Sequence, residues 1–313
     1  MNDNEKKKRR FFFRRAKRRR LQYITLLPSL VTLINGVCGF AAIGLAAKGP
    51  DYFAAAGYVI FVAMIADMLD GRLARMGHST SSFGGQLDSL CDIISFGAAP
   101  AFLSLKLLMS SLPIILSPSI DLLGDFVERL IWLASAVYLC CAAVRLARFN
   151  VENVEDETAH MSFSGLPTPA AAGVLASMVI LYQHITQDFA KETALFVAGR
   201  WIIIHILAFV TIALAVLMVS RIRYPHVVNQ YLRGKKPITH LVWAVVLIGM
   251  IYLCSLQMAM VIVFGGFAAS GFVKWLWFHT PLGKALGHKI PVQSPPGAQT
   301  ADAEQFLNGP FQP

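Results

Sequence analysis

Long apolar runs recur along the chain and are separated by short polar or basic connections. Several of these runs reach the roughly 20 residues that an α-helix needs to cross about 30 Å of hydrocarbon. A helix is favoured because it satisfies its own backbone hydrogen bonds inside a bilayer. The pattern predicts an all-α, polytopic transmembrane helix bundle with spans near 24–47, 52–76, 83–109, 128–148, 166–185, 201–221, 238–255 and 258–278.

The eight predicted spans divide the chain into four parts. Residues 1–23 form a basic tail, and residues 24–226 form a six-helix membrane core. Residues 227–281 carry two further spans, and residues 282–313 are rich in Pro, Gly and polar residues, which predicts disorder. Between the third and fourth spans, residues 111–130 are apolar but contain prolines and aspartates, so we expect them to lie along the membrane interface without a continuous helix.

Composition supports a membrane location, because 56% of the 313 residues are hydrophobic and only 15% are charged. A soluble protein of this length needs more polar surface than these residues supply. The five cysteines all fall inside predicted spans without metal-ligand spacing, so we interpret them as packing residues.

The basic residues predict the orientation of the chain in a cell (inner) membrane. With a cytoplasmic N-terminus, all but five of the 28 Lys and Arg residues lie on the inner side. Both termini are then predicted to be cytoplasmic. The basic run from Lys6 to Arg20 precedes the first span, which favours binding of anionic lipid headgroups over binding of nucleic acid.

Four aspartates interrupt the second and third predicted spans and are the candidate chemical centre. Asp67 and Asp70 are three residues apart, and Asp88 and Asp92 are four apart, so each pair lies on one helical face. A short connection makes the two helices antiparallel neighbours, and the four carboxylates are predicted to converge. Because these charges would repel one another, we expect a hard divalent cation, Mg²⁺ or Mn²⁺, and two ions in all.

Small residues accompany these acids, and they leave space beside them. Gly71, Ala74, Gly84 and Gly85 would let a flat base or a phosphate chain approach the backbone. An alternative is that the glycines are ordinary small-residue contacts between membrane helices.

The pattern D-x2-D-G-x2-A-R-x8-G-x3-D-x3-D, from Asp67 to Asp92, resembles the signature of the CDP-alcohol phosphotransferases. The resemblance implies attack of an alcohol on the phosphate joined to the donor's alcohol portion, with CMP leaving. It implies metal ligation by Asp67, Asp70 and Asp88, while Asp92 would bind the second metal and act as the base.

The same resemblance implies roles for the residues between the acids. Gly71, Ala74 and Gly84 would line the nucleotide pocket. Arg75 would either contact the diphosphate or pair with an aspartate at the helix end.

Further segments are similar to one branch of the family, the bacterial and archaeal membrane phosphatidylserine synthases. These segments are Leu27–Ile43, Arg145–Glu152, Phe163–Gly173 and Ser220–Pro225, with Ser29 standing where relatives often carry Asn. The resemblance implies transfer of a phosphatidyl group from CDP-diacylglycerol to L-serine, by a homodimer. Other acceptors (glycerol 3-phosphate or inositol), a CDP-archaeol donor, and an ion transporter remain alternatives.

Arg145 and Arg148 lie one helical turn apart at the inner end of the fourth predicted span. They would bind the lipid phosphate or the carboxylate of an amino-acid acceptor, because the guanidinium fork matches such oxyanions. The alternative is that they extend toward the membrane surface without a functional contact. Asn35, an amide inside the first span, is interpreted as a packing or pocket residue.

Overall fold

The computed structural model describes residues 29–76, 82–115, 121–155, 165–188, 194–220, 222, 224 and 255–279, and all regular structure in these residues is helical. Two compact units are distinguished, Met1–Phe272 and Val273–Pro313, and the arrangement described below is that of the first. The helices are the first helix (Ser29–Lys48), η1 (Pro50–Tyr52), α2 (Phe53–Met76), α3 (Ser82–Asp92), the π-helical turn η2 (Ile93–Ala98), α4 (Ala99–Ile115), α5 (Asp121–Glu155), α6 (Thr168–Asp188), α7 (Ala194–Val219) and α10 (Leu256–His279).

The protein is a multi-pass membrane protein. Seven segments of the described chain are long and apolar enough to cross a membrane, and they correspond to seven of the eight predicted spans. The predicted all-α bundle is therefore confirmed. The remaining predicted span, residues 238–255, lies almost entirely outside the described residues.

The stretch that the sequence predicts to lie along the membrane interface, residues 111–130, is helical at both ends, and its residues 116–120 lie outside the described part of the structure. α4 continues to Ile115 and α5 already begins at Asp121. Pro113 is accommodated within the last turn of α4, next to its end. α5 has 35 residues and is therefore roughly 52 Å long, well beyond the hydrocarbon thickness of a bilayer. Its Arg145–Asn150 segment lies near the end of this long helix.

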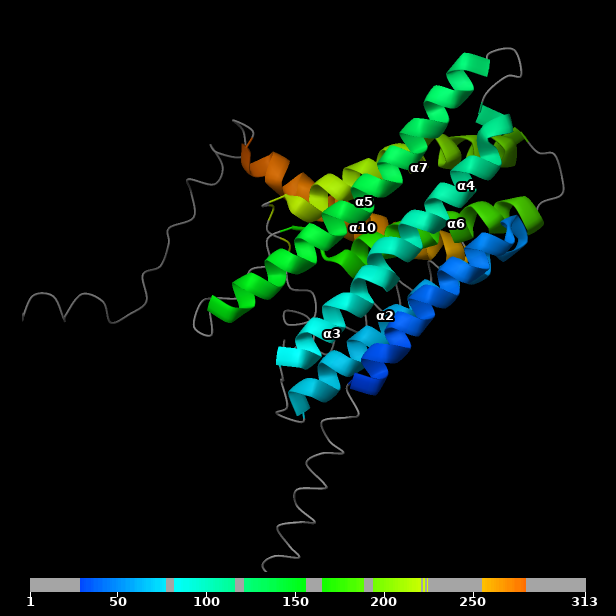
Figure 1. Ribbon diagram of the computed structural model, residues 1–313. Coiled ribbons are helices and arrows are strands. Elements are labelled where there is room, and N and C mark those ends of the chain that lie inside the picture. Colours follow the sequence, from blue (N-terminus) through cyan, green and yellow to red (C-terminus); the bar gives the residue numbers. More distant parts are fainter. Residues whose placement is uncertain are drawn as a thin grey trace, which may run out of the picture. The chain divides into compact units, whose positions relative to one another are not determined.

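α6 is the central helix of the first unit (Figure 1). In its membrane-spanning window, 78% of the residues are buried, against 33% in the window of α7. Small side chains such as Ala171, Ala172 and Ala176 allow this close packing, and α2 and α7 are its main neighbours. α5 packs mainly against α7 and α4, which completes the bundle.

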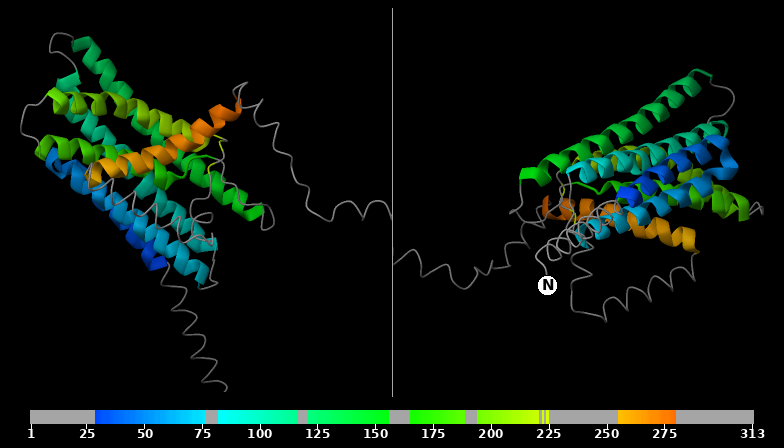
Figure 2. Two further views of the ribbon diagram at one scale, coloured as in Figure 1. Left: turned by 180° about the vertical axis from the view of Figure 1, so that it is seen from behind. Right: turned by 60° about the horizontal axis from the view of Figure 1, so that its bottom comes forward.

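The part of α10 that belongs to the first unit, residues 256–272, packs on this bundle. Figure 2 shows this helix in orange. The ring of Phe264 packs against Phe61 of α2 at a centroid distance of 5.3 Å, and it occupies the space above Gly173 of α6. The buried Tyr224 hydroxyl donates to the Ala268 carbonyl at 3.1 Å. This part of the C-terminal region therefore belongs to the same packed unit as the predicted core.

Several helix ends meet at one end of the bundle. Gly165 and Leu166, just before α6, donate backbone hydrogen bonds to Ile222 and to Leu217 at the end of α7. Gly165 has a φ of 91°, and a Cβ there would meet the Met218 carbonyl, so glycine is required for this contact. The segment before α6 is thus fixed beside the end of α7.

Candidate active site

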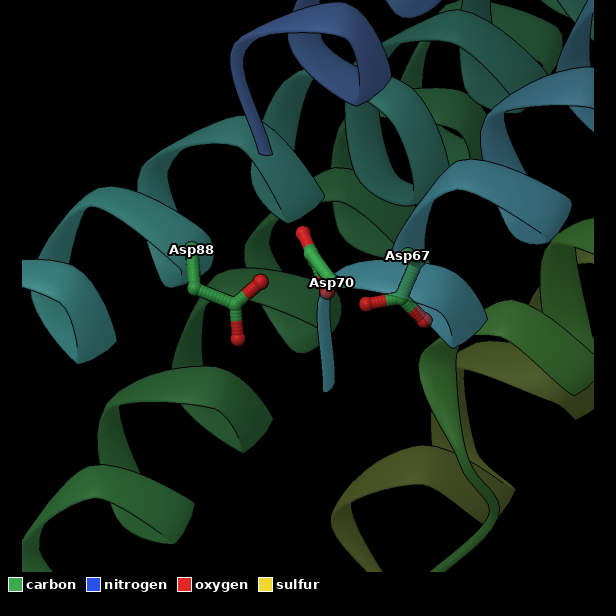
Figure 3. Close-up of side chains that lie close together, drawn as sticks. All are labelled: Asp67, Asp70 and Asp88. Carbon is green, nitrogen blue, oxygen red and sulfur yellow. The ribbon is translucent and has the colours of Figure 1, made fainter. Parts of the chain in front are cut away.

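Three of the four predicted aspartates form a compact cluster. Asp67 and Asp70 extend from the last turns of α2 and Asp88 from α3, and one carboxylate oxygen from each lies within 4.8 Å of the others. Figure 3 shows the carboxylates of Asp67 and Asp88 turned toward Asp70. The three- and four-residue spacings place the acids on facing sides of two neighbouring helices, as the sequence indicated.

This cluster has the donor set of a divalent-cation site. Asp70 is buried, with 4% of its surface exposed, yet no described residue forms a hydrogen bond to its Oδ2. Asp88 Oδ1 is buried and equally without a partner. Such buried carboxylate oxygens are costly unless something cationic binds them, and a set made only of oxygens suits a hard cation such as Mg²⁺. The residues present fit a metal.

The other contacts of Asp70 come from the first helix and from its own backbone. The Thr32 hydroxyl and the Gly71 backbone amide are its hydrogen-bonding neighbours. These donors hold one part of the carboxylate, and Oδ2 is the oxygen left over. Asp70 is thus positioned by a neighbouring helix before any ion is bound.

Asp92 lies outside this three-residue group. It is the last residue of α3, directly before the π-helical turn η2, and only 7% of it is exposed. Its Oδ1 accepts a hydrogen bond of 2.9 Å from the Asn35 side-chain amide of the first helix. The four carboxylates are therefore arranged as a cluster of three and a separately held fourth, although Asp92 remains within electrostatic range of Asp67 and Asp88.

The positions predicted to line a nucleotide pocket are only partly visible. A Cβ placed on Gly71 or on Gly85 would meet no described atom within 4 Å, so the described residues leave space beside the backbone at both. Gly84 is half-buried. The side chains of Ala74 and Arg75 lie outside the described part of the structure, so their predicted roles stay predictions.

Arg145 lies near Asp92, on α5. Its Nη1 donates to the Thr168 hydroxyl at 3.0 Å, while its Nε is buried without a hydrogen-bond partner among the described residues. The Arg145 and Asp92 side chains interact electrostatically. Arg148, one turn further, is half-buried. The structure thus brings Arg145 near Asp92, a proximity that the sequence did not predict.

A second polar contact joins α5 to α3 beside the cluster. Asn150 and Ser89 hydrogen-bond through their side chains, with Asn150 Nδ2 at 2.9 Å from Ser89 Oγ. Ser89 follows Asp88 directly, so this contact fixes the local position of α3. The sequence interpretation gave no role to Ser89, Thr32 or Thr168. For Thr32 a signal existed, because it is three residues from Asn35 and shares its helical face.

The match to a known family covers most of the described core. Residues 25–212 match the model of the CDP-alcohol phosphatidyltransferase family, and this range includes the three-carboxylate cluster, Asn35, Asp92 and Arg145. The chain belongs to the CDP-alcohol phosphatidyltransferase family. The resemblance seen in the aspartate motif is thereby confirmed.

Several proteins similar to this chain are named for the transfer of a lipid phosphate group to serine or for archaetidylserine synthesis. A CDP-diacylglycerol–serine O-phosphatidyltransferase of Helicobacter pylori is 30% identical over 256 residues, which is 80% of this chain and 92% of that protein. A protein of the same name from Methanocaldococcus jannaschii is 30% identical over 67% of this chain and 79% of its own length. An archaetidylserine synthase of Methanothermobacter thermautotrophicus is 32% identical over 64% of this chain and 70% of its own length.

Proposed function

We propose that this protein transfers a phosphatidyl group from CDP-diacylglycerol to L-serine, giving phosphatidylserine and CMP. The observation that carries the proposal is the three-carboxylate cluster with a buried fourth carboxylate and a guanidinium beside it. Relatives named for this reaction align with the chain over most of their length, which supports serine as the acceptor.

In the proposed reaction, the serine hydroxyl oxygen forms a bond to the phosphorus that carries the diacylglycerol. The bond from that phosphorus to the bridging oxygen breaks, and the electron pair leaves with CMP. Asp92 takes the proton of the attacking hydroxyl. A carboxylate held in place next to the reacting groups suits this general-base role, which contributes about 10²–10⁴-fold to a rate.

Asp67, Asp70 and Asp88 would hold the divalent cation, and Asp92 would complete the site for a second one. We propose Mg²⁺ or Mn²⁺ as the ion. When bound, such ions neutralise charge on the diphosphate and stabilise the charge that develops during displacement. The open space at Gly71, together with Gly84 and Ala74, would admit the nucleotide, and Arg75 would contact its diphosphate or pair with an aspartate.

Arg145 would bind an oxyanion of one substrate, either the lipid phosphate or the serine carboxylate. Its unpartnered Nε supports this role, because a buried guanidinium donor without a partner is unfavourable until an acceptor arrives. Arg148 is proposed for the same oxyanion from the next turn of α5. Whether the oxyanion is the lipid phosphate or the serine carboxylate, the end of α5 would bind substrate.

The direct test uses membranes that contain the protein, CDP-diacylglycerol and labelled L-serine, with Mg²⁺, with Mn²⁺ or with a chelator. Labelled phosphatidylserine should form together with an equal amount of CMP, and only with a divalent ion present. Glycerol 3-phosphate and inositol should give no lipid product. Absence of labelled lipid under both metals would overturn the assignment.

A second candidate keeps serine and changes the lipid donor. It rests on the 32% identity to an archaetidylserine synthase. Supplying CDP-archaeol in place of CDP-diacylglycerol, at matched concentrations, decides between the two donors by the ratio of the two kcat/KM values.

We further propose a homodimer in the inner membrane with both termini and the aspartate cluster at the cytoplasmic side. The distribution of Lys and Arg supports this orientation. Reporter fusions at each terminus would test it, since only cytoplasmic ends yield a fluorescent cytoplasmic reporter. Molecular mass in detergent, measured by light scattering, would test the dimer.

A further inference from the structure

The contact between Asn35 and Asp92 connects two buried polar side chains that are 57 residues apart in the chain. Asn35 has no exposed surface, and its Nδ2 donates to Asp92 Oδ1 at 2.9 Å. The other end of the same amide, Asn35 Oδ1, is buried and has no hydrogen-bond partner within the described ranges of the chain. An amide retained only for packing would be expected to have both ends satisfied by neighbouring helices.

The backbones on both sides of this contact are held close together. A Cβ on Gly36 would lie 2.9 Å from Cys91 Sγ, and one on Gly39 would lie 2.6 Å from Ser95 Cα. Ser95 Oγ also donates to the Asn35 carbonyl oxygen at 2.7 Å. The positions on the first helix (35, 36 and 39) therefore match those on the facing segment (92, 91 and 95), and the contact cannot shift along the helix without a collision.

The position of the contact in the fold is equally specific. Asp92 ends α3, and the π-helical turn Ile93–Ala98 begins at the next residue. Such turns alter the direction of side chains along a helix and are frequent at functional sites. Ser95, which fixes the Asn35 backbone, lies within this turn. The irregular turn and the first helix together set where the Asp92 carboxylate lies.

We infer that Asn35 is a positioning residue for the reaction, which acts by holding Asp92. Its N–H fixes Asp92 Oδ1, so that Oδ2 is the oxygen available to take the proton of the attacking alcohol. In this role, Asn35 contacts Asp92 and binds neither substrate. The inference rests on the proposed function, because it assigns Asn35 a task only if Asp92 serves as the base.

The test compares Asn35→Ala with the wild type in the labelled-serine assay. Removing a residue that orients a catalytic group typically costs about 10–100-fold in activity. We expect kcat to fall by about this factor while the KM values for serine and donor change by less than about threefold, since the substrates contact other residues. Mn²⁺ binding, followed by electron paramagnetic resonance, should stay within about threefold of wild type, because Asp67, Asp70 and Asp88 are unchanged.

A double-mutant comparison separates this role from general destabilisation. In an Asp92→Asn background, Asn35→Ala should lower the remaining activity by less than about twofold, since the group that it positions is already disabled. Gln183→Ala is the matched control, because Gln183 is a buried amide that donates to the Pro50 carbonyl at 2.8 Å, away from the aspartates. Gln183→Ala should lower thermal stability without the fall in kcat that is expected for Asn35→Ala.

Three results would overturn the inference. One is a kcat of Asn35→Ala within twofold of wild type. Another is that Asn35→Ala lowers activity by the same factor in the wild-type and in the Asp92→Asn background. The third is that Asn35→Ala and Gln183→Ala, when they have the same melting temperature, lower kcat equally. Failure of the proposed function is distinguishable, because then the wild type itself would make no phosphatidylserine.

Discussion

Arg145 donates through Nη1 to the hydroxyl of Thr168 at 3.0 Å, which ties the end of α5 to the first residue of α6. Thr168 is buried, and it follows the segment that Gly165 fixes against the end of α7. The guanidinium is thus held by the first residue of α6, whose preceding segment is bonded to the end of α7. Its buried Nε has no partner in the part of the chain that the structure describes, and is therefore a donor available to a ligand.

Replacing Arg145 tests whether this guanidinium binds an oxyanion. Arg145→Ala should raise the KM of one substrate by at least about tenfold, in keeping with the 1.5–3 kcal/mol of a hydrogen bond to a charged group. A change confined to serine indicates its carboxylate, and a change confined to CDP-diacylglycerol indicates the lipid phosphate. Arg129→Ala, on the exposed part of the same helix, should leave both KM values unchanged. Unchanged KM values for Arg145→Ala would remove it from the binding site.

Removing one carboxylate from the cluster should weaken metal binding. Asp88→Asn keeps the size of the side chain but lowers the negative charge facing Asp70, so we expect Mn²⁺ affinity to fall at least about tenfold. Titration of purified protein with Mn²⁺, read by electron paramagnetic resonance, measures this without any turnover. Asp125→Asn, an exposed aspartate of α5, is the control and should bind Mn²⁺ like the wild type. Equal affinity for both variants would contradict the proposed cation site.

Asp92→Asn should separate catalysis from binding. The amide cannot accept the proton of the serine hydroxyl, so kcat should fall by about 10²–10⁴-fold, with a further loss if a second ion is bound there. Binding of CDP-diacylglycerol, measured by fluorescence of a labelled donor, should largely survive. Near-normal turnover in this variant would show that Asp92 is not the base.

Two glycines of the first helix offer a matched pair for stability. Gly39→Ala places a methyl group against Ser95 and should lower the melting temperature in detergent, because backbone rather than a flexible side chain must move. Gly44→Ala meets no described atom within 4 Å and should be neutral or stabilising by up to about 1 kcal/mol. If both variants melted at the same temperature, the close approach at Ser95 would not contribute to stability.

Local sequence was sufficient to predict the membrane-spanning helices and to predict which aspartates form the cluster. Apolar runs of membrane length predict spans because a helix alone satisfies its backbone in hydrocarbon, and seven of them coincide with helices of the structure. The spacing of Asp67, Asp70 and Asp88 across a short connection also predicts their proximity. In residues 111–130, α4 extends to Ile115 and α5 begins at Asp121, so helix reaches further into this stretch than the predicted spans did. That the stretch lies along the membrane interface stays a prediction.

The sequence by itself therefore determined the membrane bundle and the three converging carboxylates, because both depend on periodicities within one or two neighbouring helices. Only the tertiary structure decided that Asp92 is bonded to Asn35 and lies outside the group of three carboxylates, and that Arg145 is bonded to Thr168. These pairs are 57 and 23 residues apart, so their contacts depend on how whole helices pack. At Asn35, that packing requires Gly36 and Gly39, which let two backbones approach each other closely. The periodicity of the sequence does not predict which helix will face these two glycines.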